Sequence, residues 1–204
     1  MHTFTETWQR SFPTATSGSH LFAEFEERAR AAAAEVFRCA TLTEAREALL
    51  RLVEGAGVTK AVVVESPLQL AAGVTEALRA RGVEVYTAPA EIAEHAPTAD
   101  IGISGVEFGV AETGSVFQEG YAIATRLVTI LPPLHVVFLP SANIVPDVPQ
   151  AFEIIAKNFD RGYLGFITGP SRTGDIERVL TIGVHGPGRF AIIACDEAPQ
   201  GGTR

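Results

Sequence analysis

The stretch "KAVVVE" (60–65), followed directly by "SPLQLAAGVTEALRARG" (66–82), decides the fold class. The first segment is apolar and rich in valine, which is typical of a strand buried on both faces. The second segment predicts a helix, because it carries an N-cap serine, a proline at the first helical position, a glutamine that closes a capping box and a terminal glycine. These signals are Ser66, Pro67, Gln69 and Gly82. With the strand predicted next at 83–86, the order strand–helix–strand indicates parallel strands, so we expect an α/β fold.

The rest of the chain extends this pattern. Four further helices are predicted. The first covers residues 21–38, the second runs from the capping box of Thr41 and Glu44 to Gly55, and the third is "ATRLVTILPP". The fourth is "DVPQAFEIIAKNF", which has Asp147 as its N-cap and an apolar face formed by Val148, Phe152, Ile155 and Phe159. Further strands are predicted at 99–105, 135–140, 162–168, 179–184 and 190–195, with a bent pair over 106–118 that turns at Thr113-Gly114. Without repeats or a long linker, this pattern predicts one domain, with a mostly parallel sheet flanked by helices, over 21–196. Residues 1–20 are predicted to be a flexible arm and 197–204 a flexible tail.

Composition limits the classes of function. The 204 residues are 47% hydrophobic and 20% charged, as in an ordinary globular domain. Their net charge of −8 argues against nucleic acid or an anionic membrane as a partner. The start has neither the basic nor the apolar region of a secretory signal, and two cysteines favour a reducing cytoplasm. A four-thiolate iron–sulfur cluster needs about four cysteines, so we expect no cofactor in this chain.

Three short stretches combine glycine with polar residues: "AETGS" (111–115), "TGPSRTGD" (168–175) and "GVHGP" (183–187). In open α/β sheets, ligands bind beyond the carboxyl ends of the strands, and we expect the three stretches to meet there in one pocket. Glycine N–H groups, hydroxyls and an arginine would bind a small anion such as phosphate or a carboxylate. The candidate ligand-binding residues are Thr113, Gly114, Gly169, Ser171, Arg172, Thr173 and Asp175. The alternative interpretation is a plain turn, with Asp175 as a cap and Arg172 in solvent.

Two residues in these stretches are candidates for catalysis. Glu112 follows an apolar segment, so its carboxylate is predicted to be partly buried and could act as a nucleophile or proton carrier. His185 lies between glycines and could act as a general base near neutral pH. The structural alternatives are an acid paired with Arg126 or with backbone N–H groups, and a histidine that makes a hydrogen-bonding corner.

Taken together, the runs "AETGSV", "LPPLHVVFLPSANIV" and "TGPSRTGDIERVLTIGVHGP" resemble the LUD-domain lactate-utilisation proteins of the small LutC/YkgG type. The resemblance covers residues 60–196. It implies a NagB/RpiA/CoA-transferase-like α/β fold and a role in the oxidation of L-lactate to pyruvate. It also implies partner subunits that hold the iron–sulfur clusters. It supplies no catalytic residues for this short type, so the candidate residues rest on the physical argument.

Three functions are therefore open. The chain is an accessory component of a lactate-oxidising system, an acyl- or CoA-transferase in its own right, or a small-anion sensor. The second hypothesis rests on the "AETG" turn, in which Glu112 is similar to the nucleophilic glutamate of related CoA transferases. Fold alone does not choose among them.

Overall fold

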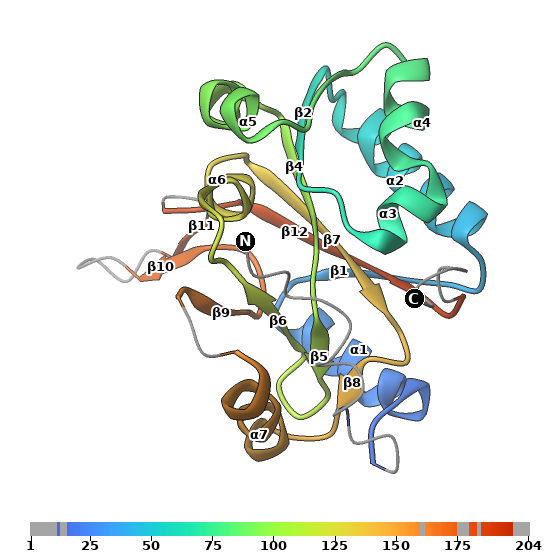
Figure 1. Ribbon diagram of the computed structural model, residues 1–204, viewed down its shortest axis with the longest axis vertical. Helices are drawn as coiled ribbons and strands as arrows, with labels where there is room; N and C mark the ends of the chain where they lie inside the picture. Colours follow the sequence, from blue (N-terminus) through green and yellow to red (C-terminus); the bar gives the residue numbers. More distant parts are fainter. Residues whose placement is uncertain (1–11, 13–15, 160–161, 175–179, 183–184, 198–204) are drawn as a thin grey trace.

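Six parallel strands form the main sheet, in the order β1-β12-β7-β4-β2-β3 (Figure 1). Their bounds are β1 (Glu35–Cys39), β2 (Lys60–Val63), β3 (Glu84–Tyr86), β4 (Ile101–Gly105), β7 (Leu134–Pro140) and β12 (Arg189–Cys195). The computed structural model describes residues 12, 16–159, 162–174, 180–182 and 185–197. The predicted α/β domain with a parallel sheet flanked by helices is confirmed.

Helices cover both faces of this sheet. α2 (Leu42–Ala56), α3 (Pro67–Ala72) and α4 (Val74–Ala80) pack on one face, against side chains such as Ile101 and Ile103. α1 (Phe22–Ala31), α5 (Pro89–His95) and α6 (Ile123–Ile130) lie on the other face. Two 3₁₀ turns, η2 (Ser19–Leu21) and η3 (Ala96–Thr98), flank α1 and α5. Since alternate residues of a strand face opposite sides, Gly102 and Ser104 point toward α6.

A second sheet packs beside α1 on the same face. Its order is β8-β5-β6-β9, with β5 (Phe108–Val110), β6 (Ser115–Glu119), β8 (Ile144–Val145) and β9 (Leu164–Ile167). α7 (Val148–Asn158) covers its outer side through an aromatic cluster in which Phe108 and Phe117 stack with ring centroids 4.7 Å apart. The predicted strand pair that turns at Thr113-Gly114 is confirmed as antiparallel β5 and β6.

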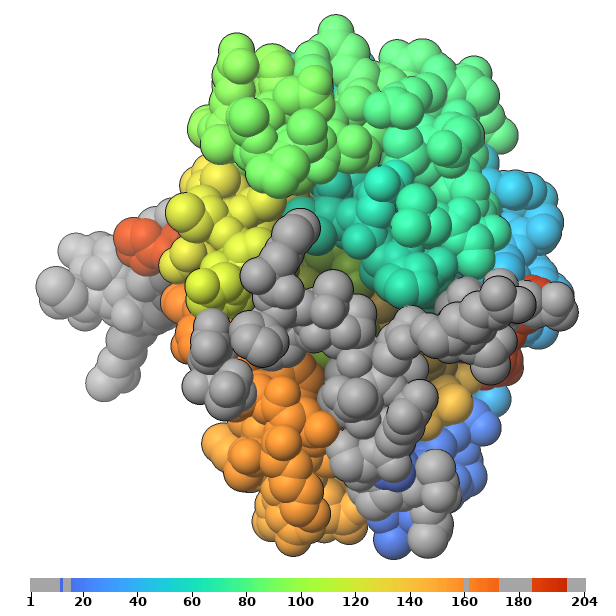
Figure 2. Space-filling view, viewed as in Figure 1, coloured from blue at the N-terminus to red at the C-terminus, as the bar shows by residue number. Residues whose placement is uncertain are grey.

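β10 (Arg172–Gly174) and β11 (Leu180–Ile182) form a separate antiparallel pair. Their described residues lie at the left margin of the molecule in the space-filling view (Figure 2). The prediction that 179–184 joins the main sheet is wrong for Leu180–Ile182. Among the described residues, no helix is long and apolar enough to cross a membrane.

Several predicted helix ends are confirmed. Thr41 accepts a hydrogen bond from the Glu44 N–H, and Ser66 and Gln69 form both bonds of a capping box. Asp147 accepts from the Gln150 N–H at the start of α7. These caps form because a short polar side chain satisfies an N–H group that the helix leaves unpaired.

Other predicted boundaries are wrong. Residues 21–38 do not form one helix, because α1 ends at Ala31 and residues 35–39 become β1. The segment "EVFR" is strand because it pairs in parallel with β12. The helix predicted over 66–82 is broken at Gly73, which has φ +64° and ends α3. α2 continues to Ala56, beyond the predicted end at Gly55.

The predicted burial is also corrected at two places. α7 buries Ala151, Ile154 and Ile155, whereas Phe152 is 56% exposed. β9 is an edge strand of the second sheet, with alternating exposed residues, and not a buried strand of the main sheet. Local hydrophobicity favours a core strand, but the pairing with β6 leaves one edge of β9 without a strand neighbour among the described residues.

The predicted arm and tail lie mostly outside the described residues. In the described part, Phe12 is buried in the aromatic cluster, and the Gly18 N–H donates to the Ile144 carbonyl at 2.9 Å. Glu197 accepts a hydrogen bond from the Leu42 N–H at 2.8 Å.

Candidate functional site

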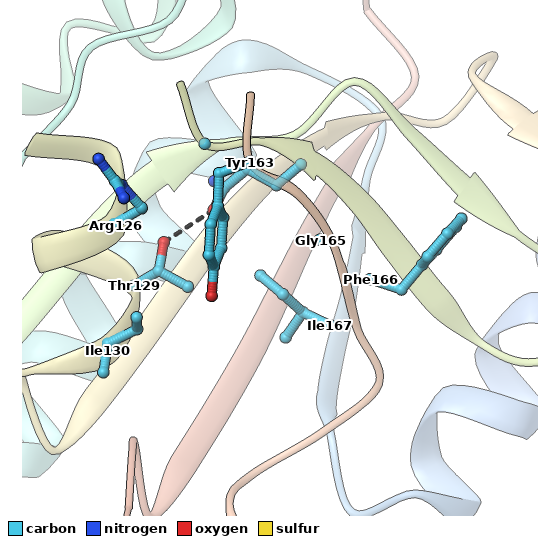
Figure 3. Close-up of a pocket in the computed structure, with 9 residues that line it drawn as sticks. Arg126, Thr129, Ile130, Tyr163, Gly165, Phe166 and Ile167 are labelled. Carbon is cyan, nitrogen blue, oxygen red and sulfur yellow. Dashed lines mark hydrogen bonds between the residues drawn. The ribbon is translucent and has the colours of Figure 1, made fainter. Parts of the chain in front are cut away.

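A small cavity lies between α6, the end of β6 and β9 (Figure 3). Its volume is about 140 Å³. The residues that line it are Gln118, Gly120, Arg126, Thr129, Ile130, Tyr163, Gly165, Phe166 and Ile167. The wall is thus largely apolar, with one cation, the hydroxyl groups of Thr129 and Tyr163 and one amide, a composition that suits a small polar ligand.

Arg126 supplies the positive charge of the cavity wall. It is the one charged residue of α6. Its buried Nε has no hydrogen-bond partner among the described residues, and the guanidinium carbon lies 5.3 Å from the ring centroid of Tyr163. A guanidinium that stacks on an aromatic ring keeps its in-plane N–H donors for a planar anion. Arg126 is therefore the best-placed anion-binding residue in the cavity.

A chain of hydrogen bonds leads from the cavity into the main sheet. The Thr129 hydroxyl donates to the Gln118 side-chain oxygen at 2.7 Å, the dashed line in Figure 3. The Gln118 amide nitrogen donates to the Ser104 hydroxyl and to the Gly105 carbonyl, at 2.8 Å each. Because a backbone carbonyl only accepts hydrogen bonds, this contact fixes which end of the Gln118 amide faces Thr129.

The chain ends at a buried histidine. The Ser104 hydroxyl and the His135 Nε2 are 2.9 Å apart. Which of the two atoms donates depends on the tautomer of the ring, and Nδ1 has no hydrogen-bond partner among the described residues. Burial lowers the pKa of His135 to about 3, so the ring is neutral. No partner for His135 is visible in the sequence around it, because its partners come from β4 and β6.

Two carboxyl groups lie near the end of β6, which precedes Gly120 of the cavity wall. Glu107 accepts a hydrogen bond from the Glu119 N–H at 2.9 Å, and Glu119 accepts one from the Tyr121 N–H at 2.7 Å. Desolvation raises the pKa of Glu107 to about 8 and also raises that of Glu119. Near neutral pH Glu107 is therefore mainly protonated.

The three glycine-rich stretches do come together in part, but by close backbone packing. Gly114, at φ +66°, lies so close to α1 that a Cβ would collide with the backbone of Ala29, and a Cβ at Gly169 would collide with the Ala32 carbonyl. The Ser115 and Thr168 hydroxyls are 2.9 Å apart and join the first stretch to the second. These glycines allow close approach between segments.

The second and third stretches also touch. The Ser171 N–H donates to the Pro187 carbonyl at 2.9 Å, and a Cβ at Gly186 would contact Ser171. Pro187 shortly precedes β12, so this contact lies at the amino end of that strand. The predicted position beyond the carboxyl ends of the sheet is therefore wrong for Ser171 and His185.

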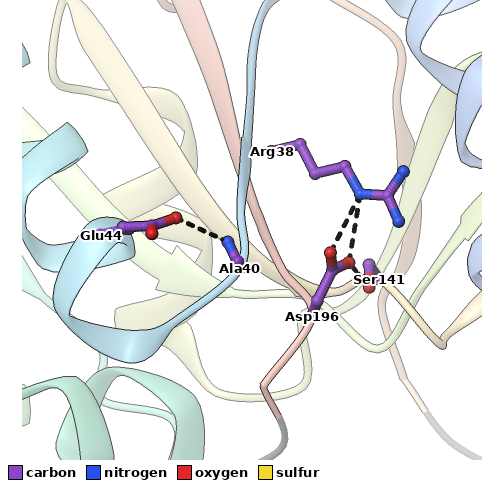
Figure 4. A network of polar contacts seen from close by, with 5 residues as sticks. All are labelled: Arg38, Ala40, Glu44, Ser141 and Asp196. Carbon is purple, nitrogen blue, oxygen red and sulfur yellow. Dashed lines mark hydrogen bonds and ion pairs between the residues drawn. The ribbon is translucent and has the colours of Figure 1, made fainter.

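The carboxyl ends of β1, β12 and β7 hold a different polar network (Figure 4). Asp196, just after β12, forms an ion pair with Arg38 at 3.1 Å and accepts a short hydrogen bond from the Ser141 hydroxyl. The Ala40 N–H donates to the Glu44 carboxylate at 2.8 Å. These contacts tie strand ends to the loops that follow them.

The other candidate residues are spread over the structure. Glu112 is exposed, which corrects its predicted burial, and its carboxylate accepts from the Val148 N–H at 3.1 Å at the start of α7. Thr113 accepts from the Ser115 N–H. His185 is exposed, and Arg172 and Thr173 lie on β10. Asp175 lies outside the described residues. A ligand-binding role for these residues stays a prediction.

The sequence alone does not predict the residues of the cavity, because they come from segments that are distant along the chain. One signal is present: Arg126 is the lone charge in the otherwise uncharged helix "IATRLVTI". In the described part of the chain, no group of three or more His, Cys, Asp or Glu is placed to hold a metal ion.

Fold and sequence together define the class. The chain matches the LUD domain model over residues 22–195 and belongs to the LUD domain family, as the resemblance indicated. The crystal structure of a DUF162 family protein from Deinococcus radiodurans has the same fold, with a TM-score of 0.61 at 20% identity over 87% of this chain and 97% of that one.

The chain is also similar in sequence to several individual proteins. Lactate utilization protein C of Bacillus subtilis (strain 168) is 38% identical over 103 residues, which cover 48% of this chain and 43% of that protein. The protein of the same name from Anoxybacillus flavithermus is 32% identical over 146 residues, 71% of this chain and 66% of the relative. Escherichia coli (strain K12) YkgG is 32% identical over 161 residues, 74% and 69% of the two chains. The chain thus spans less than two thirds of the length of the first two relatives.

Proposed function

We propose that this protein is a component of an L-lactate utilisation system that oxidises L-lactate to pyruvate in the cytoplasm together with iron–sulfur partner proteins. The observation that carries the proposal is the match to the LUD domain over residues 22–195, together with relatives named for lactate utilisation. The free cysteines Cys39 and Cys195 support a reducing compartment.

The cysteines also support the assignment of the clusters to the partners. A cluster ligated by four thiolates does not fit a chain with two cysteines. Both are buried, and burial raises the pKa of Cys39 to about 11, which favours the protonated thiol over the thiolate that binds iron. The electron-transfer step is therefore proposed to occur in the partner chains, with this chain in an accessory or substrate-binding role.

Deletion of the gene in its source organism tests this proposal. We expect the deletion strain to lose growth on L-lactate as the sole carbon source, to grow normally on glucose and to recover with a plasmid copy of the gene. Unimpaired growth on L-lactate would refute the proposal. Affinity purification of the tagged protein from lactate-grown cells should recover iron-containing partner proteins.

A further inference from the structure

We propose that the cavity beside α6 binds a short 2-hydroxycarboxylate, with Arg126 holding the carboxylate and Thr129 Oγ1 accepting the proton of the 2-hydroxyl group. This inference deepens the proposed function and rests on it for the choice of L-lactate as the probe. The site itself is argued from the geometry of this chain.

The guanidinium group of Arg126 has no hydrogen-bond partner in the described part of the chain. No described residue forms an ion pair or hydrogen bond with its guanidinium, and its Nε is buried at the cavity. A buried donor without a partner is costly, so a ligand or water that satisfies it would stabilise this arrangement. A carboxylate matches the planar fork of the guanidinium and can be held by two parallel hydrogen bonds.

Thr129 faces the cavity as an acceptor. Its hydroxyl has one proton and two neighbouring acceptors, the Gln118 side-chain oxygen at 2.7 Å and the Thr125 carbonyl at 2.8 Å. The Gln118 amide is held in this orientation by the Gly105 carbonyl. With the proton used by either neighbour, Oγ1 offers lone pairs to a ligand. It can therefore accept a hydrogen bond from a ligand hydroxyl but gives none to a ligand carbonyl.

The spacing and size match a small 2-hydroxy acid. Arg126 and Thr129 are three residues apart on α6, and such residues are neighbours on one helix face. The cavity has a volume of about 140 Å³. A cavity of about 150 Å³ holds benzene, which has as many non-hydrogen atoms as lactate. Apolar groups of Ile130 and Ile167 complete the wall and suit a methyl group.

The acceptor role of Thr129 predicts selectivity. A 2-hydroxy acid donates its hydroxyl proton to Oγ1, whereas a 2-oxo acid would place a carbonyl oxygen against it. Propionate lacks the hydroxyl altogether. Since an unmade hydrogen bond at a polar site costs affinity, we expect L-lactate to bind about tenfold or more tightly than pyruvate or propionate.

Calorimetric titration of the purified chain with L-lactate, pyruvate and propionate tests the proposal. Arg126→Met should weaken binding of all three by about tenfold or more, while Arg81→Met, which removes an exposed charge on the opposite face of the main sheet, should change nothing. Thr129→Val should remove the preference for L-lactate over propionate. Thr129→Ser keeps the hydroxyl and should retain the preference, and thermal melts check that each variant is folded.

Three results of these titrations would overturn the proposal. Wild-type protein that gives no binding heat with any of the three acids, or that binds pyruvate as tightly as L-lactate, would overturn the assignment of this site. So would an Arg126→Met protein that binds L-lactate like wild type. These results would leave the growth phenotype of the deletion strain untouched, so failure of the site is separable from failure of the proposed function.

Discussion

Gly102 in β4 lies directly against the main-chain carbonyl of Val128 in α6, so closely that a Cβ at position 102 would collide with it. This contact sets how closely α6 packs against the main sheet. Since Arg126 and Thr129 project from the same helix, the glycine fixes the depth at which both face the cavity.

Gly102→Ala is therefore expected to push α6 outward. We expect a loss of about 1–3 kcal/mol in the free energy of unfolding, since overpacking a tight contact costs about this much, measured by urea denaturation. Gly55→Ala is the matched control. It lies in α2, where an added methyl group would have no neighbouring atom within 4 Å, and it should be neutral or slightly stabilising. Equal effects of the two substitutions would contradict the proposal that Gly102 allows the close packing of α6 on the main sheet.

The pKa of Glu107 predicts a pH dependence of stability. Its carboxyl group has an ordinary pKa of 4.5, as in the unfolded chain, and desolvation raises it to about 8 in the folded protein. Between these values the folded state binds more protons, so the free energy of unfolding falls as pH rises, by at most about 1.4 kcal/mol per pH unit. The contribution is fully present below pH 4.5. Glu119, whose pKa is also raised, acts in the same direction.

Glu107→Gln should remove this slope. Because the lowered pKa of His135 acts in the opposite direction between pH 3 and 6.5, the informative quantity is the difference between wild type and variant. We expect the variant to gain stability relative to wild type as pH rises from about 5 to 8. Parallel curves for the two proteins would show that Glu107 titrates near its ordinary value.

Glu112→Gln separates the accessory role from a transferase. Its carboxylate accepts from the Val148 N–H at the start of α7, a contact that an amide oxygen can keep. We expect a stability change below about 1 kcal/mol, since the substitution removes only the favourable interaction of the charge with the helix N-terminus. Complementation of the deletion strain on L-lactate should remain normal. Loss of growth with a stably folded variant would favour a nucleophilic role for Glu112.

Local signals in the sequence predict the elements that local physics controls. The N-cap at Thr41, the capping box at Ser66 and the valine-rich strand that begins near Lys60 lie where expected, because each depends on residues a few positions apart. The helix predicted through Glu35 is wrong, since the helical composition of that segment is outweighed by pairing with β12. Only the tertiary fold supplies that partner strand.

The candidate site is less predictable than the fold. Glycines at 114 and 169 are typical of a ligand loop, but the structure uses them for close packing against α1 and the residue that follows it. Arg126, Thr129 and Tyr163 meet only when β9 pairs with β6 beside α6. Such a meeting has no signature in any single stretch of the chain, apart from one arginine in an uncharged helix.

The most direct test of the account is a crystal structure of this protein soaked with L-lactate. We predict density for the ligand beside α6, with its carboxylate at Arg126 and its hydroxyl at Thr129 Oγ1. Ligand density at Ser171, Arg172 or His185, with the cavity beside α6 holding only water, would contradict it.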